Sequence, residues 1–396
     1  MERRLVLRAD VIPTVTGSAI PTVIARATVI AGGRDGNRLV VIFKPTTRCN
    51  IKCLHCYVGD MRNVYTDMSV EGAHQILEKL PVKTEIIFHG GEPSLMGTDF
   101  YNRVTQGFEG KFNFSMQTNL TLMDEQWVPL IENTLKRRLS TSFDFGESLR
   151  PIEASDWINK INVFKRNGIT PYVVSIFWKG NQHMAPGEIF SFFSNLDLSF
   201  RLNYVENIGY AVDSGFPALR HDAGRYASCL KSLFDRWFMS PDANIIIDPC
   251  CEILTFFLAG SSVTKCPFSS KCYANIISVN PNGDVFPCGG FDSFPGFRYG
   301  NLLKQNYSDI FSAPSYIEAG CRRINLPSQC QECPYFHICE GGCRLEAYSY
   351  YGDINRETSM CGEYKEIFSH IENRLGEEKG DVSDWLSSLT AKRRTQ

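Results

Sequence analysis

The pattern of hydrophobic and polar positions predicts a repeating order of strands and helices over residues 38–240. Short β-branched or aromatic runs alternate about six times with amphipathic segments of helical period. Ser69 and Asp124 are typical residues at helix starts, and Gly168 is typical of a helix end. This alternation predicts a parallel sheet with right-handed crossovers, either a partial barrel or a doubly wound sheet.

The distribution of cysteine suggests two domains. Of 15 cysteines, three lie between Cys49 and Cys56 and eight ligand candidates lie between Cys266 and Cys361. We therefore expect a β-rich segment that adds a hairpin to a sheet edge, a barrel domain, a cysteine-rich domain and a loosely attached tail that could dock as one short helix. Their predicted bounds are 1–37, 38–240, 241–370 and 371–396.

Composition argues against some classes of binding partner and of cellular compartment. The 396 residues are 43% hydrophobic, and 41 Lys and Arg nearly balance 43 Asp and Glu, so no broad electrostatic field favours nucleic acid or an anionic membrane. Charges and Pro13 interrupt the N-terminus before an apolar run of signal-peptide or membrane-span length. We expect a cytoplasmic protein. A reducing cytosol and an odd number of cysteines disfavour disulfides, so metal ligation explains the cysteines better.

The first cysteine block follows the first predicted strand. Cys49, Cys53 and Cys56 have the spacing C-x3-C-x2-C on one loop, at the end of the strand where barrel enzymes place their active sites. Three thiolates can hold three irons of a four-iron cluster and leave the fourth iron open to another ligand. A zinc site is the alternative, but it needs four ligands and no fourth one closes this loop.

The cysteine loop, together with FHGGEP at the end of the second strand, resembles the radical SAM superfamily. The resemblance implies a partial (β/α)6 TIM-type barrel in which S-adenosylmethionine (SAM) chelates the open iron. It also implies reductive cleavage to a 5′-deoxyadenosyl radical that removes a hydrogen atom from substrate. For each polar residue at a strand end, a simple cap is an equal alternative. The residues expected near SAM are His55, Gly90, Gly91, Glu92, Pro93, Gln117, Asn119, Ser142 and Asp144.

The second cysteine block, with PNGDVFPCG and CEGGCR, resembles the SPASM domain of radical SAM enzymes, a small domain with a β-hairpin and short helices. The resemblance implies two auxiliary clusters, so that the chain carries three [4Fe-4S] clusters. Two structural zinc sites are the alternative. Complete ligand sets favour electron transfer over direct binding of substrate. The implied sets are Cys266, Cys272, Cys288 and Cys343 for one cluster, and Cys330, Cys333, Cys339 and Cys361 for the other.

SPASM proteins mostly modify peptides, so the leading hypothesis is an oxidoreductase that abstracts a hydrogen atom from a peptide residue and forms a crosslink, a thioether or an oxidised side chain. A flavodoxin or ferredoxin is expected as reductant. The alternative is an oxidoreductase or epimerase that acts on a small molecule in natural-product biosynthesis. An open groove would favour a peptide, and a closed pocket would favour a metabolite.

Formylglycine formation, the reaction of anaerobic sulfatase-maturating enzymes, is ranked lower. Those enzymes carry an aspartate base directly after the third ligand of the first auxiliary cluster, whereas here Gly289 follows Cys288. Asp292 is the nearest carboxylate and is the candidate base. Other candidates at loop or strand-end positions are Glu206, Tyr204 and His183.

Overall fold

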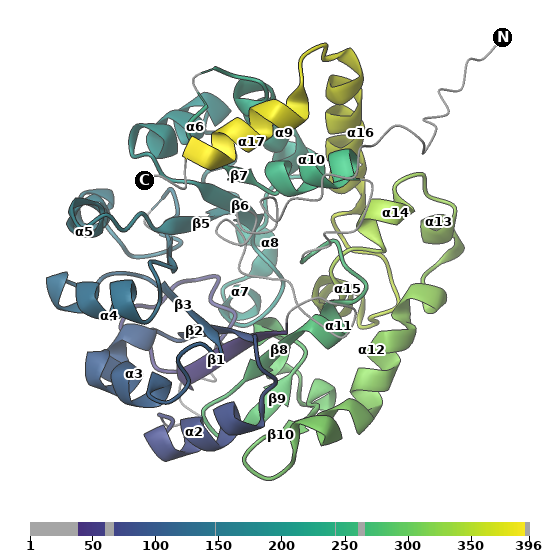
Figure 1. Ribbon diagram of the computed structural model, residues 1–396. Helices are drawn as coiled ribbons and strands as arrows, with labels where there is room; N and C mark the ends of the chain where they lie inside the picture. Colours follow the sequence, from purple (N-terminus) through teal and green to yellow (C-terminus); the bar gives the residue numbers. More distant parts are fainter. Residues whose placement is uncertain (1–38, 60–66, 147, 242, 260–265, 393–396) are drawn as a thin grey trace.

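The computed structural model describes residues 39–59, 67–146, 148–241, 243–259 and 266–392 (Figure 1). The predicted N-terminal hairpin within residues 1–37 lies outside the described residues. No helix in the described part of the chain is long and apolar enough to cross a membrane.

A ten-stranded sheet organises the chain, with the strand order β10-β9-β8-β1-β2-β3-β4-β5-β6-β7. The strands from β8 through β1 to β7 pair in parallel, and the β8–β9 and β9–β10 pairs are antiparallel. The predicted α/β architecture is confirmed. The strands are β1 (Val40–Thr46), β2 (Glu85–Gly90), β3 (Asn113–Thr118), β4 (Leu139–Ser142), β5 (Tyr172–Phe177), β6 (Phe200–Tyr204), β7 (Ile247–Asp248), β8 (Ile276–Val279), β9 (Asp284–Phe286) and β10 (Gly300–Asn301).

Helices connect the parallel strands and cover the outer face of the sheet (Figure 1). Ser69 caps the first of them by accepting a hydrogen bond from the Gly72 amide at 3.0 Å, as the sequence predicts. These helices are α2 (Val70–Lys79), α3 (Gly97–Thr105), α4 (Val128–Asn133), α5 (Ala154–Arg166), α6 (Pro186–Asn195) and α9 (Arg225–Trp237). Two short helices, α7 (Tyr210–Asp213) and α8 (Phe216–Leu219), follow β6 and pack in a separate apolar cluster with Leu149 and Trp178.

The main core lies between these helices and the sheet. Phe43 and Phe88 point outward from β1 and β2 and are fully buried, together with Trp157 of α5. Alternate residues of the same strands point to the other face, where Ile42 and Ile87 face the cysteines of the second block. The period of two in these strands therefore separates a structural face from a face that is free to line a site.

The cysteine-rich region is joined to the barrel sheet by main-chain hydrogen bonds. Residues Val40–Phe43 of β1 pair with Ile276–Val279 of β8, so the hairpin β8–β9 continues the sheet beyond its first strand. The sequence predicts this hairpin but gives no sign of its pairing with β1. The remaining helices are α10 (Cys250–Ala259), α11 (Cys272–Asn275), α12 (Pro314–Asn325), α13 (Ser328–Gln331), α14 (Phe336–Cys339), α15 (Arg344–Tyr351), α16 (Cys361–Glu377) and α17 (Val382–Lys392).

The C-terminal helices return to the barrel. Helix α16 packs against α9, and α17 places the Trp385 ring 5.0 Å from the Trp237 ring. The predicted division at residue 370 falls inside α16, and the short docked helix that the tail sequence allows is α17.

Candidate active site

The first cysteine block forms a loop at the carboxyl end of β1, with its thiols close together. Burial, together with the neighbouring Cys56 and Cys49, raises the pKa of Cys53 to about 12. The guanidinium of Arg150 opposes this shift and donates to the Cys53 sulfur at 3.6 Å. Because burial opposes ionisation of Cys53, a bound cation would stabilise its thiolate, which is the behaviour of a metal ligand.

The two glycines of FHGGEP allow this loop to lie against β2. A Cβ atom on Gly91 would lie 1.9 Å from the Arg48 carbonyl oxygen, and one on Gly90 would lie 2.4 Å from that of Thr46. The backbone of Gly90 has a φ of +116°, which side chains rarely permit. The Gly91 amide donates to the Thr46 carbonyl at 3.0 Å. The glycine pair therefore fixes the position of the cysteine loop.

Glu92 is buried, with 1% of its surface exposed, and protein donors occupy its carboxylate. Ser94 donates through its amide and its hydroxyl, at 2.9 and 2.6 Å. The Thr118 hydroxyl donates at 2.6 Å and the Asn119 amide at 2.8 Å. Glu92 thus ties the end of β2 to the end of β3. Pro93 is buried behind it and starts a 3-10 turn, η2 (Pro93–Met96).

The polar residues that end β3 and β4 face the same space as the cysteine loop. Gln117 donates from Nε2 to the Ser142 hydroxyl at 2.9 Å. Asn119 donates from Nδ2 to Asn50 at 3.0 Å and lies 3.9 Å from the Cys49 sulfur. The structure therefore brings together three residues that the sequence predicts beside SAM.

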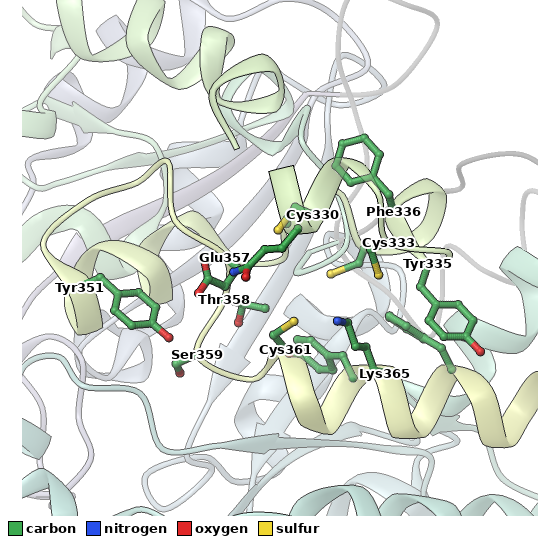
Figure 2. A pocket seen from close by; sticks show the side chains of 15 residues that line it. Cys330, Cys333, Tyr335, Phe336, Tyr351, Glu357, Thr358, Ser359, Cys361 and Lys365 are labelled. Atoms are coloured by element: carbon green, nitrogen blue, oxygen red, sulfur yellow. The ribbon is translucent and has the colours of Figure 1, made fainter. Parts of the chain in front are cut away.

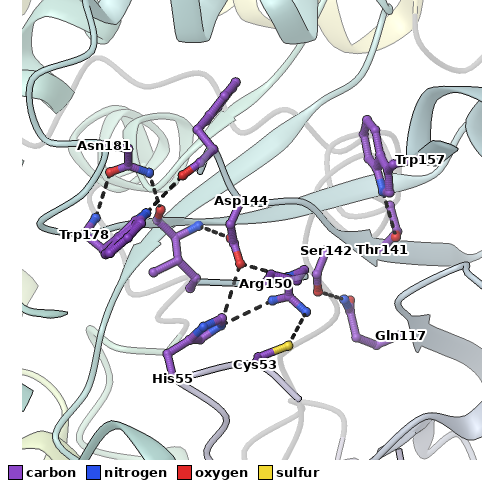
Figure 3. Close-up of polar contacts among 12 residues, drawn as sticks. Cys53, His55, Gln117, Thr141, Ser142, Asp144, Arg150, Trp157, Trp178 and Asn181 are labelled. Atoms are coloured by element: carbon purple, nitrogen blue, oxygen red, sulfur yellow. Dashed lines mark hydrogen bonds and ion pairs between the residues drawn. The ribbon is translucent and has the colours of Figure 1, made fainter. Parts of the chain in front are cut away.

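Asp144, just beyond the end of β4, is bound by Arg150 and by the backbone of β5 (Figure 3). Its carboxylate accepts from the Ile176 amide at 2.7 Å and from Nε of Arg150 at 2.8 Å. Arg150 extends from there to Cys53 and to Nε2 of His55, which is 3.3 Å away. Burial lowers the pKa of His55 to about 4, so the ring is neutral at pH 7. Asp144 therefore orients Arg150 toward the cysteine loop.

One cavity of about 450 Å³ joins these features to the second cysteine block. Side chains from six successive strands, β1 to β6, line it, which shows that the sheet curves around it as a partial barrel. Cys49, Cys53 and Cys56 lie at one side, and Cys266 and Cys343 also contribute to the wall. Polar side chains such as Gln117 and Arg150 share its lining with apolar ones such as Ile42, which is the composition of a ligand-binding cavity.

The structure brings together both predicted sets of four cysteines. In the first set, burial raises the pKa values of Cys266 and Cys343; the charges of Cys272 and Cys288 add to the rise for Cys266, and those of Cys266 and Cys288 add to it for Cys343. The second set lines a separate cavity of about 170 Å³ (Figure 2). Its members are Cys330, Cys333, Cys339 and Cys361. Sets of four clustered thiols suit iron-sulfur clusters.

The candidate bases lie in different environments. Asp292 is buried, forms an ion pair with Lys44 and is absent from the cavity lining. His183 is exposed on a loop outside the cavity. Tyr204 lines the cavity, but its hydroxyl lies 2.8 Å from that of Tyr364 and 3.2 Å from Glu346. Glu206 lines the cavity.

Several residues of the site were not predicted from the sequence. Lys44 is fully buried, donates to the Gly289 carbonyl at 3.3 Å and lies 4.9 Å from the ring centre of Tyr57. The Tyr57 hydroxyl is 3.1 Å from Nδ1 of His89, and both rings line the cavity. A lone lysine within the apolar run VVIFKP and a histidine directly before two glycines are the signals that could have found them.

Comparison with known families agrees with this arrangement. The Radical SAM superfamily matches residues 43–182, and SPASM, an iron-sulfur cluster-binding domain, matches residues 271–334. The chain contains a radical SAM domain and a SPASM domain. These matches identify a radical SAM enzyme whose cofactors are SAM and iron-sulfur clusters.

Sequence similarity to known proteins covers most of the chain. The cysteine-type anaerobic sulfatase-maturating enzyme of Clostridium perfringens is 24% identical over 366 residues, which are 85% of this chain and 97% of that protein. The serine-type enzyme of Bacteroides thetaiotaomicron is 21% identical over 376 residues, which are 84% and 89% of the two chains. The solved structure of anSMEcpe with bound AdoMet and Cp18Cys peptide has a TM-score of 0.72 at 20% identity, over 85% of this chain and 98% of that one.

These relatives show that our ranking of reactions from the sequence is wrong. It placed peptide crosslinking and related oxidations above formylglycine formation, whereas relatives that match over 84–85% of this chain are sulfatase-maturating enzymes of both types. The ranking relied on Gly289, the residue after Cys288. A base need not lie at one sequence position, because the fold brings carboxylates from other elements to the cavity.

Proposed function

We propose that this radical SAM enzyme oxidises a cysteine or serine side chain of a peptide or protein substrate to formylglycine. The collinear similarity to cysteine-type and serine-type sulfatase-maturating enzymes supports this proposal. The cavity of about 450 Å³ supports it further, because its wall includes both the first cysteine loop and two cysteines of the SPASM region. A substrate side chain in that cavity lies near the source of the radical and near an electron acceptor.

The ligand assignment is part of the proposal. Three cysteines of the first loop hold the cluster that binds SAM, and the GGEP backbone, Gln117, Asn119 and Ser142 surround SAM. The two sets of four cysteines hold the auxiliary clusters, the first beside the cavity and the second in its own cavity (Figure 2). When bound, SAM supplies by reductive cleavage the radical that removes a hydrogen atom from substrate.

Residues around the first cysteine loop hold it in place and stabilise its charge. The glycine pair and Glu92 hold the cysteine loop against the ends of β2 and β3. Arg150 stabilises negative charge on the Cys53 sulfur, and Asp144 orients Arg150. We further propose a flavodoxin or ferredoxin as reductant and the cytoplasm as the compartment, because a low-potential donor and a reducing environment are required.

The test uses anaerobically reconstituted protein with dithionite, SAM and the Cp18Cys peptide or its serine counterpart. We expect 5′-deoxyadenosine together with an aldehyde in the peptide, detected by mass and by hydrazine labelling. Serine would lose two hydrogens, and cysteine would exchange its SH and one hydrogen for oxygen. 5′-Deoxyadenosine with a crosslinked or unmodified peptide would contradict formylglycine formation, and zinc in place of iron would contradict the cofactor assignment.

A further inference from the structure

Three carboxylates line the cavity, and they differ in how they are bound. Glu92 accepts four hydrogen bonds from protein donors at the ends of β2 and β3. Glu252 of α10 forms an ion pair with Arg201 of β6. Within the described part of the chain, no hydrogen bond or ion pair engages the carboxylate of Glu206. Glu206 is therefore the cavity carboxylate whose lone pairs are available to a substrate.

Its position suits a group that acts on substrate. Glu206 follows the carboxyl end of β6 and is half-buried, with its side chain in the cavity wall. Glu206 shares the cavity wall with Cys266 and Cys343, so the carboxylate lies on the side of the cavity that carries the SPASM cysteines. A proton and an electron leaving the substrate would therefore travel to the same side.

The surroundings of Glu206 also favour a basic carboxylate. Burial raises its pKa to about 7, and the nearby carboxylate of Glu346 on α15 contributes to this rise. The other titratable groups around it are Tyr204 of β6 and the SPASM cysteines Cys266, Cys288 and Cys343. A base with a pKa near 7 combines a useful ionised fraction with enough affinity for a proton.

Neither His89 nor Asp292 can act as a base in the same way. His89 lines the cavity, but its Nδ1 accepts from the Gly90 amide at 2.7 Å, so the ring presents a donor at Nε2. Burial and Lys44 lower the pKa of His89 to about 4, which makes it a weak base. Asp292 is paired with Lys44 away from the cavity lining.

We propose that the Glu206 carboxylate is the base that accepts the thiol or hydroxyl proton of the substrate side chain; this inference rests on the proposed function. The substrate Cβ loses one hydrogen atom to the radical from SAM, its S–H or O–H proton passes to Glu206, and one electron passes to an oxidised auxiliary cluster. A C=O bond forms from serine. A C=S bond forms from cysteine, and water then replaces sulfur as hydrogen sulfide.

The experiment compares holoenzyme carrying Glu206→Gln with wild type and with Glu188→Gln, the same chemical change at an exposed site on α6. The substrate is the Cp18Cys peptide deuterated at the cysteine Cβ. Deuterium in 5′-deoxyadenosine measures hydrogen abstraction, and the aldehyde measures the complete reaction. We expect E206Q to retain deuterium transfer within about twofold and to lose aldehyde per transfer by about 100-fold, the range of general base catalysis.

Two further measurements separate a base from a structural residue. In wild type, aldehyde per deuterium transfer should rise with pH through about 7, because only the ionised carboxylate accepts a proton, and E206Q should lose this dependence. Glu206→Asp should recover part of the yield. An infrared band of a protonated carboxyl that titrates near pH 7 should be present in wild type and absent from E206Q.

The outcomes are distinct. Wild-type aldehyde yield in E206Q at unchanged pH dependence would overturn the inference while leaving the proposed function intact. Loss of deuterium transfer in both E206Q and E206D, at wild-type iron content, would also overturn it, because Glu206 would then position substrate. Absence of aldehyde from the wild-type enzyme with either peptide would refute the proposed function itself.

Discussion

Replacing Glu92 by glutamine tests whether this residue binds SAM, as the sequence predicts, or holds two strand ends together, as its contacts indicate. One carboxylate oxygen accepts three hydrogen bonds, from the Ser94 amide at 2.9 Å and from the Ser94 and Thr118 hydroxyls at 2.6 Å. The other oxygen accepts from the Asn119 amide at 2.8 Å. A glutamine keeps one of these acceptor oxygens and replaces the other with an NH2 group, which is a donor.

The best orientation of the new side chain keeps its oxygen on the three-donor side. Its NH2 group then faces the Asn119 amide, so one hydrogen bond to a charged acceptor is lost and two donors oppose each other in a buried site. Such a loss costs about 1.5–3 kcal/mol, and the three remaining bonds weaken because their acceptor is neutral. We expect E92Q to lower the free energy of unfolding by about 3 kcal/mol.

The loss should also displace Asn119, which contacts Asn50 and lies near the Cys49 sulfur. Urea unfolding of reconstituted protein, followed by tryptophan fluorescence, measures the change in stability, and 5′-deoxyadenosine formation measures its effect on the site. Glu188→Gln on the outer face of α6 is the matched control. Wild-type stability of E92Q together with weaker SAM binding would show that Glu92 contacts SAM directly.

Three further changes probe other parts of the molecule. Replacing Cys49, Cys53 and Cys56 together by Ala should abolish 5′-deoxyadenosine while about eight irons stay bound by the SPASM region; retained cleavage would refute the SAM site. Gly91→Ala should displace the cysteine loop, because a Cβ there would lie 1.9 Å from a backbone oxygen, and iron analysis should find about four irons lost. Trp385→Ala should lower the free energy of unfolding by about 2 kcal/mol, since the ring is partly buried against Trp237, without changing SAM cleavage per holoenzyme.

The sequence predicted the elements of the barrel closely because local periodicity determines them. β2 spans the run that begins at Glu85, and Ser69 and Asp124 cap the segments that follow them. The metal chemistry was also predictable, since ligand spacing on a loop is a local property and cysteine thiolates are the ligands of iron-sulfur clusters. The prediction of the reaction failed because it relied on a single position, Gly289.

What the sequence could not show depends on contacts between distant residues. The pairing of β8 with β1 joins residues more than 230 positions apart and places the SPASM cysteines against the barrel interior. The same fold buries Asp292 beside Lys44, binds Glu92 with protein donors and leaves Glu206 free in the cavity.

The sequence by itself therefore determined the alternation of strands and helices in the barrel and the class of cofactor, because periodicity and ligand spacing are local properties of the chain, and the resemblance to the SPASM domain supplied the two cysteine sets. Only the tertiary structure decided which polar groups are bound by the protein and which face the cavity. Burial and hydrogen bonding set the proton affinity of each carboxylate, and both depend on residues brought together from separate strands.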